Sequence, residues 1–252
     1  MPIYGKRLRH CVRVRRDCRG GLCYDSDTMD DPKIEQASYY GHALHYRWLN
    51  AVYDPVTRWL CRERNFKTAL VRQTGIEPGD RVLDLACGTG TLAIMLKTAF
   101  PLSDITGLDG SAEILAMAAD KAAQAGVEIS FVHGLSYDMP LDDETFDRVT
   151  CSFFFHHLRP DEKVTTLEEV ARLLKAGGQL HVADWGAQPN PAMRSAFALV
   201  QLLDGFETTR DSVEGKLPEY MRDCGFAGVE ETGHVITGLG SVSLYQATRP
   251  RS

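Results

Sequence analysis

The chain has 252 residues, of which 44% are hydrophobic and 25% are charged, proportions that are ordinary for a globular protein. Its net charge of −6 combines +6 in residues 1–23 with −12 in the remainder. An acidic body argues against nucleic-acid binding, which needs a clustered basic face, and no apolar run approaches the roughly 18 residues that span a bilayer. We therefore expect a cytoplasmic protein with neither a nucleic-acid partner nor a transmembrane segment.

The chain divides into a tail and one domain. Residues 1–35 are basic and are expected to form a disordered N-terminal tail. Two alternatives stay open: the segment precedes the true start of the protein, or it is a targeting arm. Residues 36–252 form the domain, with helices at 36–75, a core at 76–186, a helical insertion at 187–215, and a final helix and strands at 216–250.

Strands and helices are expected to alternate through this domain. Apolar residues recur at helical spacing from residue 37 to 72, which predicts two helices before the core. Further helices are expected at 90–99, 111–125, 161–175, 190–203 and 218–224. Strands are expected at 81–86, 104–108, 129–133, 146–153, 178–184, 229–236 and 241–247. This alternation predicts a parallel sheet with helices on both faces.

The first expected strand leads into the most informative turn of the chain. Apolar residues surround Asp84 at the strand end, and Gly88 and Gly90 then give the freedom for a backbone to approach a ligand closely. Asp109 ends the next apolar run about 20 residues later, where a carboxylate can bind ribose hydroxyls. The unit predicts an adenosine-containing cofactor at the carboxyl ends of the strands.

Two such cofactors fit the glycine pattern. Residues 88–93 satisfy the GxGxxA form of the dinucleotide fingerprint, which is a weak match. A carboxylate at Asp84 would repel a pyrophosphate, which needs a helix N-terminus without nearby anions. The same carboxylate suits S-adenosylmethionine, which carries an ammonium and a sulfonium. Asp84 therefore favours S-adenosylmethionine and disfavours a nicotinamide oxidoreductase.

Six motifs then follow in the order of one family. They are residues 82–90 (VLDLACGTG), 107–111 (GLDGS), 139–147 (MPLDDETFD), 153–158 (FFFHHL), 174–180 (LKAGGQL) and 181–185 (HVADW). Over residues 53–249 the chain resembles the class I S-adenosylmethionine-dependent methyltransferases, within them the group related to ubiquinone and menaquinone biosynthesis. The resemblance implies an α/β fold: a doubly wound, mostly parallel seven-stranded sheet, Rossmann-like, with helices on both faces and an antiparallel last strand.

The resemblance also implies an activity. The chain would transfer a methyl group from S-adenosyl-L-methionine to a small-molecule acceptor by in-line displacement, leaving S-adenosyl-L-homocysteine, and would be a monomer or a homodimer. The alternative is a catalytically silent protein that binds S-adenosylmethionine as a partner or scaffold. DNA and protein-amine methyltransferases are disfavoured, because neither Asn-Pro-Pro nor Asp-Pro-Pro follows the fourth strand.

The resemblance implies a cofactor contact for residues in several of these motifs. Asp84 would hold the ammonium, Asp109 would accept both ribose hydroxyls, and Gly110 would leave room beside them. The family often has Gly-Asp-Ala after the third strand, where this chain has Gly-Leu-Ser, so backbone groups of Leu135 and the Ser136 side chain are expected to fix adenine. The turn that would cradle the amino-acid part consists of Ala86, Cys87, Gly88, Thr89 and Gly90.

The sequence signals for the methyl-acceptor site are less specific than those for the cofactor site. Ser152, counted with the cofactor residues, and Phe153 should face the sulfonium at the end of the fourth strand. His156 or His157 is expected to accept a proton at neutral pH, although a structural histidine at a turn is as common. The 187–215 insertion is expected to lie over this site, and no metal is expected. Further acceptor-lining residues are Tyr40, Tyr53, Asp184 and Trp185, for which aromatic packing and turn capping are the alternatives.

Overall fold

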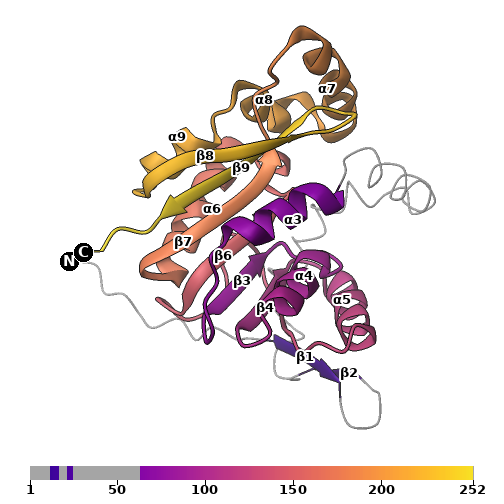
Figure 1. The fold of residues 1–252 in the computed structure, drawn as a ribbon, viewed down its shortest axis with the longest axis vertical. Coiled ribbons are helices and arrows are strands. Elements are labelled where there is room, and N and C mark those ends of the chain that lie inside the picture. The colour runs from indigo at the N-terminus through magenta and orange to yellow at the C-terminus, as the bar shows by residue number, and fades with distance from the viewer. Residues whose placement is uncertain (1–11, 17–21, 25–62, 252) are drawn as a thin grey trace.

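The structure, a computed structural model, describes residues 12–16, 22–24 and 63–251. It contains a nine-stranded sheet in the order β2-β1-β5-β4-β3-β6-β7-β9-β8 (Figure 1). The strands are β1 Val12–Arg16, β2 Leu22–Tyr24, β3 Arg81–Leu85, β4 Asp104–Asp109, β5 Ser130–His133, β6 Phe146–Ser152, β7 Leu174–Trp185, β8 Ala227–Ile236 and β9 Ser241–Thr248. The helices are α3 Glu63–Gln73, α4 Thr91–Ala99, α5 Ala112–Gln124, α6 Pro160–Leu173, α7 Pro191–Asp204, α8 Phe206–Glu214 and α9 Leu217–Asp223, with a 3-10 turn, η2, at Phe155–His157.

Seven of these strands reproduce the predicted fold class. Neighbouring strands from β5 through β4, β3 and β6 to β7 run parallel, whereas β9 lies antiparallel between β7 and β8. Parallel neighbours need crossover connections, and α4, α5 and α6 supply them. The expected seven-stranded, mostly parallel sheet with an antiparallel last strand is therefore confirmed.

The other two strands come from the expected tail. β1 pairs antiparallel with β5, and β2 pairs with β1. In these eight residues the structure differs from the prediction of disorder. The reason is an alternation of valine and arginine at residues 12–15, which suits a strand, next to the otherwise open edge of β5. The other residues of the 1–35 segment lie outside the described part.

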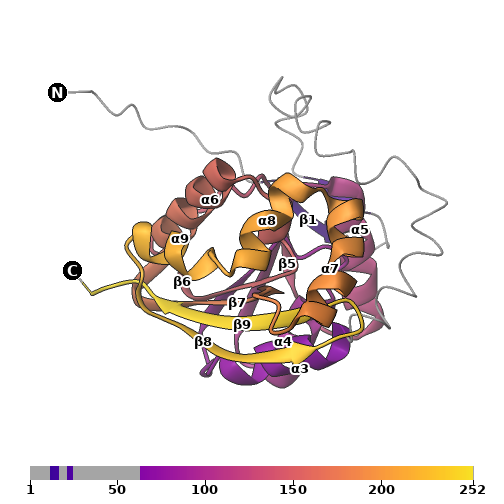
Figure 2. The ribbon, with the colours of Figure 1, turned by 90° about the horizontal axis from the view of Figure 1, so that it is seen from above.

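Helices cover both faces of the sheet. Seen from above, α6 and α9 lie on one side of the strands, and α3 and α4 lie on the other (Figure 2). Two apolar clusters fill these layers. One joins β3 and β6 to α6 and α9, and the other joins β3, β7 and β9 to α3, α4 and α7. Beyond the carboxyl end of β7 the chain continues into α7 and α8 (Figure 1).

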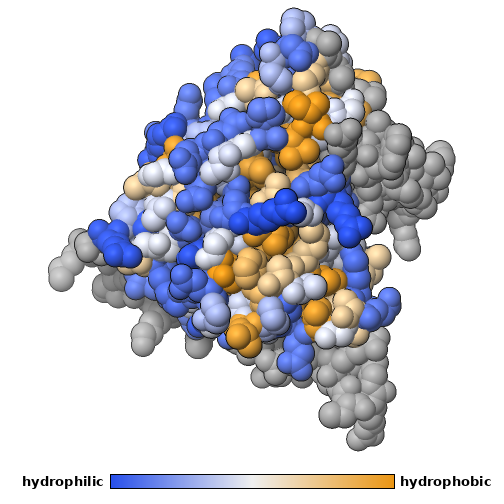
Figure 3. All heavy atoms as spheres, in the orientation of Figure 1, coloured by the Kyte–Doolittle hydropathy of each residue, from blue (hydrophilic) through white to orange (hydrophobic). Residues whose placement is uncertain are grey.

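The surface is mostly hydrophilic on the face that Figure 3 presents, with apolar residues in small groups between polar ones. Large hydrophobic side chains with substantial exposure occur singly in the sequence: Leu102, Met117, Leu202 and Ile236. Scattered exposed apolar residues are normal on globular proteins. Within the described residues, none of the helices combines the length and the apolar character needed to span a membrane.

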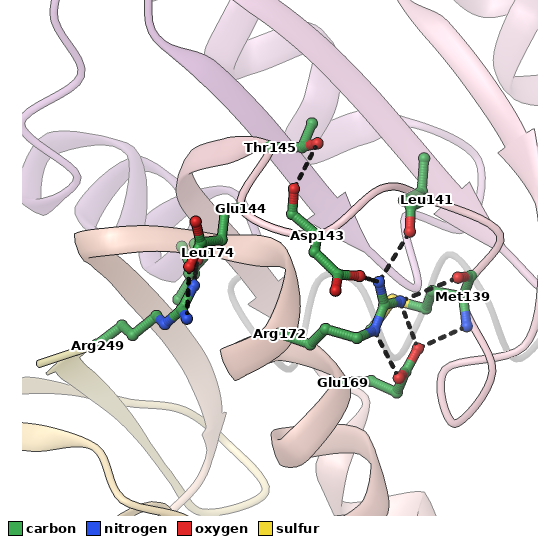
Figure 4. Close-up of polar contacts among 9 residues, drawn as sticks. All are labelled: Met139, Leu141, Asp143, Glu144, Thr145, Glu169, Arg172, Leu174 and Arg249. Atoms are coloured by element: carbon green, nitrogen blue, oxygen red, sulfur yellow. Dashed lines mark hydrogen bonds and ion pairs between the residues drawn. The ribbon is translucent and has the colours of Figure 1, made fainter. Parts of the chain in front are cut away.

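Residues 139–147, one of the six motifs, cover the second half of the loop between β5 and β6 and the start of β6, and Arg172 at the end of α6 holds this loop. The guanidinium donates to the backbone carbonyls of Met139 and Leu141 at 3.1 and 2.9 Å. It also pairs with Asp143 at 2.5 Å and with Glu169 at 2.7 Å (Figure 4). Glu169 in turn accepts the backbone N–H of Met139 at 2.9 Å. These contacts to Met139, Leu141 and Asp143 give the motif a structural role, which is to hold the loop against α6.

Candidate active site

Asp84 is the buried acid of the site. It lies next to the last residue of β3 and is 1% exposed. Its Oδ1 accepts a hydrogen bond from the Thr150 hydroxyl at 3.2 Å, whereas its Oδ2 has no hydrogen-bond partner among the described residues. Burial raises the pKa of Asp84 from 3.8 to about 7, against the lowering effects of the Lys67 charge, of the Thr150 hydroxyl and of the Ala93 backbone N–H. A cation bound at Oδ2 would offset this desolvation and favour the carboxylate.

The turn after β3 leaves space for a ligand beside its backbone. Ala86, Gly88 and Gly90 all have positive φ, at 52°, 53° and 72°. A Cβ atom placed on Gly88 would meet nothing within 4 Å, whereas one on Gly90 would lie 3.1 Å from the Cβ of Ala118. Gly90 is thus needed for packing against α5, and Gly88 lines open space. The first turn of α4 contains no acidic residue.

Asp109 ties this turn to the next one. Its Oδ2 accepts the N–H of Gly88 at 2.9 Å, and its Oδ1 accepts the N–H of Ser111 at 3.0 Å. Ser111 caps α5 through a 3.4 Å hydrogen bond from the N–H of Ile114. Burial raises the pKa of Asp109, although the Gly88 and Ser111 N–H groups lower it. Each carboxylate oxygen keeps acceptor capacity for a ribose hydroxyl.

On the adenine side, the Ser136 hydroxyl already has a side-chain partner. The Ser136 hydroxyl shares a 3.0 Å hydrogen bond with Thr166 on α6 and therefore helps to hold the turn. The backbone of Leu135 forms an isolated bridge with that of Asp138. His133, which the sequence did not single out, places its Nε2 at 3.0 Å from the carbonyl of Gly110. Because a carbonyl only accepts, Nε2 carries the proton and Nδ1 of the neutral ring is an acceptor.

Aromatic rings pack together after β6. Phe153, a non-glycine residue with a φ of 54°, stacks on Trp185 at a centroid distance of 4.9 Å and lies 4.5 Å from Phe66 of α3. Phe197 of α7 meets Trp185 edge-on at 5.2 Å. Trp185, expected to line the acceptor site, is only 4% exposed and packs in this cluster. Phe153 and the preceding Ser152 are half-buried.

His156 and Asp184 form a buried pair. The imidazole Nδ1 lies 2.6 Å from Oδ1 of Asp184, and both residues are at most 3% exposed. Asp184 also accepts the N–H groups of Phe154, His156 and Trp185 at 3.2, 3.4 and 2.7 Å. Although burial would raise the pKa of Asp184, the His156 side chain and the Trp185 N–H outweigh it and lower this pKa below its ordinary value. Asp184 was expected to line the acceptor site, but it is enclosed and orients the turn that carries His156.

His157 has a different environment from its neighbour. It is exposed, and its ring centroid lies 3.9 Å from that of His156. Although part of the side chain reaches solvent, neighbouring protein atoms desolvate the ring and lower its pKa below the ordinary value near 6.5. The His156 ring adds to this lowering. His157 is therefore neutral at physiological pH. Tyr40 and Tyr53 lie outside the described residues.

Several residues that sequence reasoning missed lie near Asp84. Thr150 and His181 occupy neighbouring strands in register with Asp84, and Lys67 approaches Asp84 from α3. Polar residues inside otherwise apolar strands were the available signal for Thr150 and His181. A search of the described residues gives no group of three or more His, Cys, Asp or Glu side chains arranged to hold a metal.

Comparison with known proteins complements this geometry. Residues 82–178 match the family model of a methyltransferase domain. The chain is similar to the demethylmenaquinone methyltransferase of Clavibacter sepedonicus, at 28% identity over 80% of this chain and 87% of that one. It is similar to the ubiquinone/menaquinone biosynthesis C-methyltransferase of Bdellovibrio bacteriovorus, at 36% identity over 64% and 66% of the two chains. In fold it is similar to an S-adenosylmethionine-dependent methyltransferase of Methanosarcina mazei, with a TM-score of 0.57, 19% identity, and coverage of 70% and 95%.

Proposed function

The chain belongs to the S-adenosylmethionine-dependent methyltransferases, and we propose that it methylates a small-molecule acceptor at the carboxyl ends of β3, β4 and β6. The observation that carries this proposal is Asp84, a buried carboxylate with one unpartnered oxygen beside a backbone turn with open space. An anionic site of this kind fits a ligand that brings an ammonium and a sulfonium. It does not fit a pyrophosphate.

Each part of the donor would meet a group that the fold already fixes. Asp84 would hold the ammonium, and the backbone from Ala86 to Gly90 would cradle the amino-acid part. Asp109, held by Gly88 and Ser111, would accept the ribose hydroxyls. Leu135 would contact adenine through its backbone, while Ser136 supports the turn from the side of Thr166. When bound, the donor supplies a methyl carbon that the sulfonium activates toward a nucleophile.

Proton removal is assigned to the histidine turn. Asp184 can only accept from the His156 Nδ1, so a neutral His156 ring has its basic nitrogen at Nε2. His156 is therefore the better-oriented proton acceptor, with Asp184 as the positioning residue. His157 is the more accessible alternative. Much of the rate of such a displacement comes from holding the acceptor in line, so the acid–base contribution is expected to be about 100-fold.

The acceptor is best sought among quinol-like rings. Both relatives described above carry names that refer to quinone biosynthesis, and demethylmenaquinone is the acceptor that one of those names contains. Incubation with methyl-labelled S-adenosylmethionine and a demethylmenaquinone analogue should transfer label to the acceptor. S-adenosylhomocysteine should bind in calorimetry, and NAD should not. Binding without transfer to any acceptor in a broad panel would favour the silent partner, and preference for NAD would refute the proposed class.

A further inference from the structure

Two buried polar atoms lack a hydrogen-bond partner within the described part of the chain, and they belong to one row of side chains across the sheet. The atoms are Oδ2 of Asp84 and Nε2 of His181. Their residues are 1% and 0% exposed, respectively. Thr150, on the strand between them, is in register with both. Two such atoms on one row call for a common explanation, since buried polar groups are almost always satisfied.

The three side chains share the face of the sheet that α3 covers. Asp84 alternates with Val82, and His181 alternates with Ala183, and both of these apolar residues pack in the cluster that contains α3. The hydrogen bond from Thr150 to Asp84 places that hydroxyl on the same face. Asp84 and His181 are two strands apart, so their backbones are separated by about 10 Å. Because neither atom has a hydrogen-bond partner among the described residues, the two side chains do not bond to each other directly across this span.

The His181 ring is oriented by Gln73 of α3. The Gln73 amide nitrogen donates to the carbonyl of Tyr245 at 3.1 Å and lies 3.4 Å from Nδ1 of His181, while its oxygen accepts from Thr232 at 2.7 Å. Because the amide nitrogen can only donate, Nδ1 of His181 is the acceptor and Nε2 carries the proton. Burial lowers the pKa of His181 to about 3, so the ring is neutral with this single N–H.

The direction of that N–H follows from the strand order. Tyr245 and Thr232 belong to β9 and β8, so Gln73 contacts His181 from the β9 side of β7. The two ring nitrogens point to roughly opposite sides of an imidazole, so Nε2 faces β6 and β3. A buried donor without a partner therefore points along the row toward a buried acceptor without a partner. A group that both accepts and donates satisfies the two atoms at once.

We propose that a buried water molecule bridges the Nε2–H of His181 and the Oδ2 of Asp84, which makes His181 a positioning residue for the methyl donor. The water accepts from His181 and donates to Asp84, and Thr150 is within the row as a third partner; two to four partners are typical of buried waters. With Oδ1 bound to Thr150 and one lone pair of Oδ2 bound to water, the carboxylate is fixed in rotation. Its remaining lone pair is directed to the ammonium, a role that rests on the proposed function.

A double-mutant cycle on S-adenosylhomocysteine affinity, measured by calorimetry, tests this inference. His181→Leu should weaken binding about fivefold, the worth of one water-mediated hydrogen bond. His181→Gln, which keeps an N–H donor, should retain affinity within twofold. In an Asp84→Asn background, His181→Leu should have no further effect, because His181 acts through the Asp84 carboxylate. Nitrogen NMR of His181 in the wild type should show the proton on Nε2.

Thr232→Val is the matched control, since it removes a hydrogen bond on the other side of Gln73 and should destabilise the fold without changing affinity. Equal affinities of His181→Leu and Thr232→Val would overturn the inference, as would the same loss from His181→Leu with and without Asp84. If His181→Leu does not fold, a high-resolution crystal structure of the wild type tests the inference instead. We expect a water within hydrogen-bond distance of both His181 Nε2 and Asp84 Oδ2. A direct hydrogen bond between these two atoms would refute the bridging water. Failure of the wild type to bind S-adenosylhomocysteine would instead refute the proposed function.

Discussion

The polar cluster around Arg172, where β6 and β7 begin, contrasts with the one around Asp84 near the end of β3. The Arg172 guanidinium donates to two carbonyls and pairs with two carboxylates, one of which also holds a backbone N–H (Figure 4). The Asp84 row instead keeps two buried atoms without partners among the described residues. Complete pairing of a polar cluster indicates a structural role, whereas a buried atom without a partner marks a place where a ligand or a water completes the site.

The largest effect is expected from breaking the complete cluster. Arg172→Ala should lower the free energy of unfolding by about 3 kcal/mol, because it removes a donor from two backbone carbonyls and from the partly buried carboxylate of Glu169. Chemical denaturation measures this loss. Affinity for S-adenosylhomocysteine should stay within twofold of the wild type. A large loss of affinity with unchanged stability would show that the distinction between the two clusters is wrong.

Asp109 shares a feature with each of these clusters. Its oxygens are paired with backbone N–H groups, as in the Arg172 cluster, and they retain acceptor capacity for a ligand, as at Asp84. Asp109→Ala should weaken S-adenosylhomocysteine binding about 30-fold, or ~2 kcal/mol, with a smaller loss of stability. Calorimetry and denaturation on the same variant separate the two effects. An unchanged affinity would mean that the ribose hydroxyls are bound elsewhere.

Asp84 predicts a pH dependence with a definite sign. Its pKa of about 7 lies above the unfolded value of 3.8, so its ionisation makes the ligand-free protein less stable as pH rises through this window. A bound ammonium favours the ionised form. Affinity for S-adenosylhomocysteine should therefore rise by about fivefold between pH 6 and pH 7, and binding should release up to one proton. Asp84→Asn should abolish this dependence, and an unchanged slope in that variant would assign it to another group.

The smallest effect is expected at Ser136, whose hydroxyl already has a partner. Ser136→Ala should cost about 1 kcal/mol of stability through the lost bond to Thr166, and affinity for S-adenosylhomocysteine should stay within twofold. Thr166→Val offers a matched control, because it removes the same bond from the other side. A loss of affinity in Ser136→Ala but not in Thr166→Val would show that the Ser136 hydroxyl contacts adenine.

The fold was predictable because its signals are local. Glycines, caps and apolar periods along the chain locate the strands and helices, and Asp84 with Asp109 identifies the cofactor side. The acceptor side was less predictable, since the enclosure of Asp184 and Trp185 depends on which neighbours fold against them. The row of Asp84, Thr150 and His181 was equally hidden, because it exists only once three distant strands are in register.

The position of β9 has a consequence for how the sheet assembles. β8 pairs with β9 and has no other strand neighbour in the described sheet, and β9 also covers the edge of β7. A nascent chain that has not yet reached Ser241 can form the parallel strands but exposes the edge of β7, and β8 has nothing to pair with. Open strand edges invite pairing with other chains. Of the described strands, β9 comes latest in the chain and is the one that joins β8 to β7, so a chain truncated before it should aggregate even though most of its core is present.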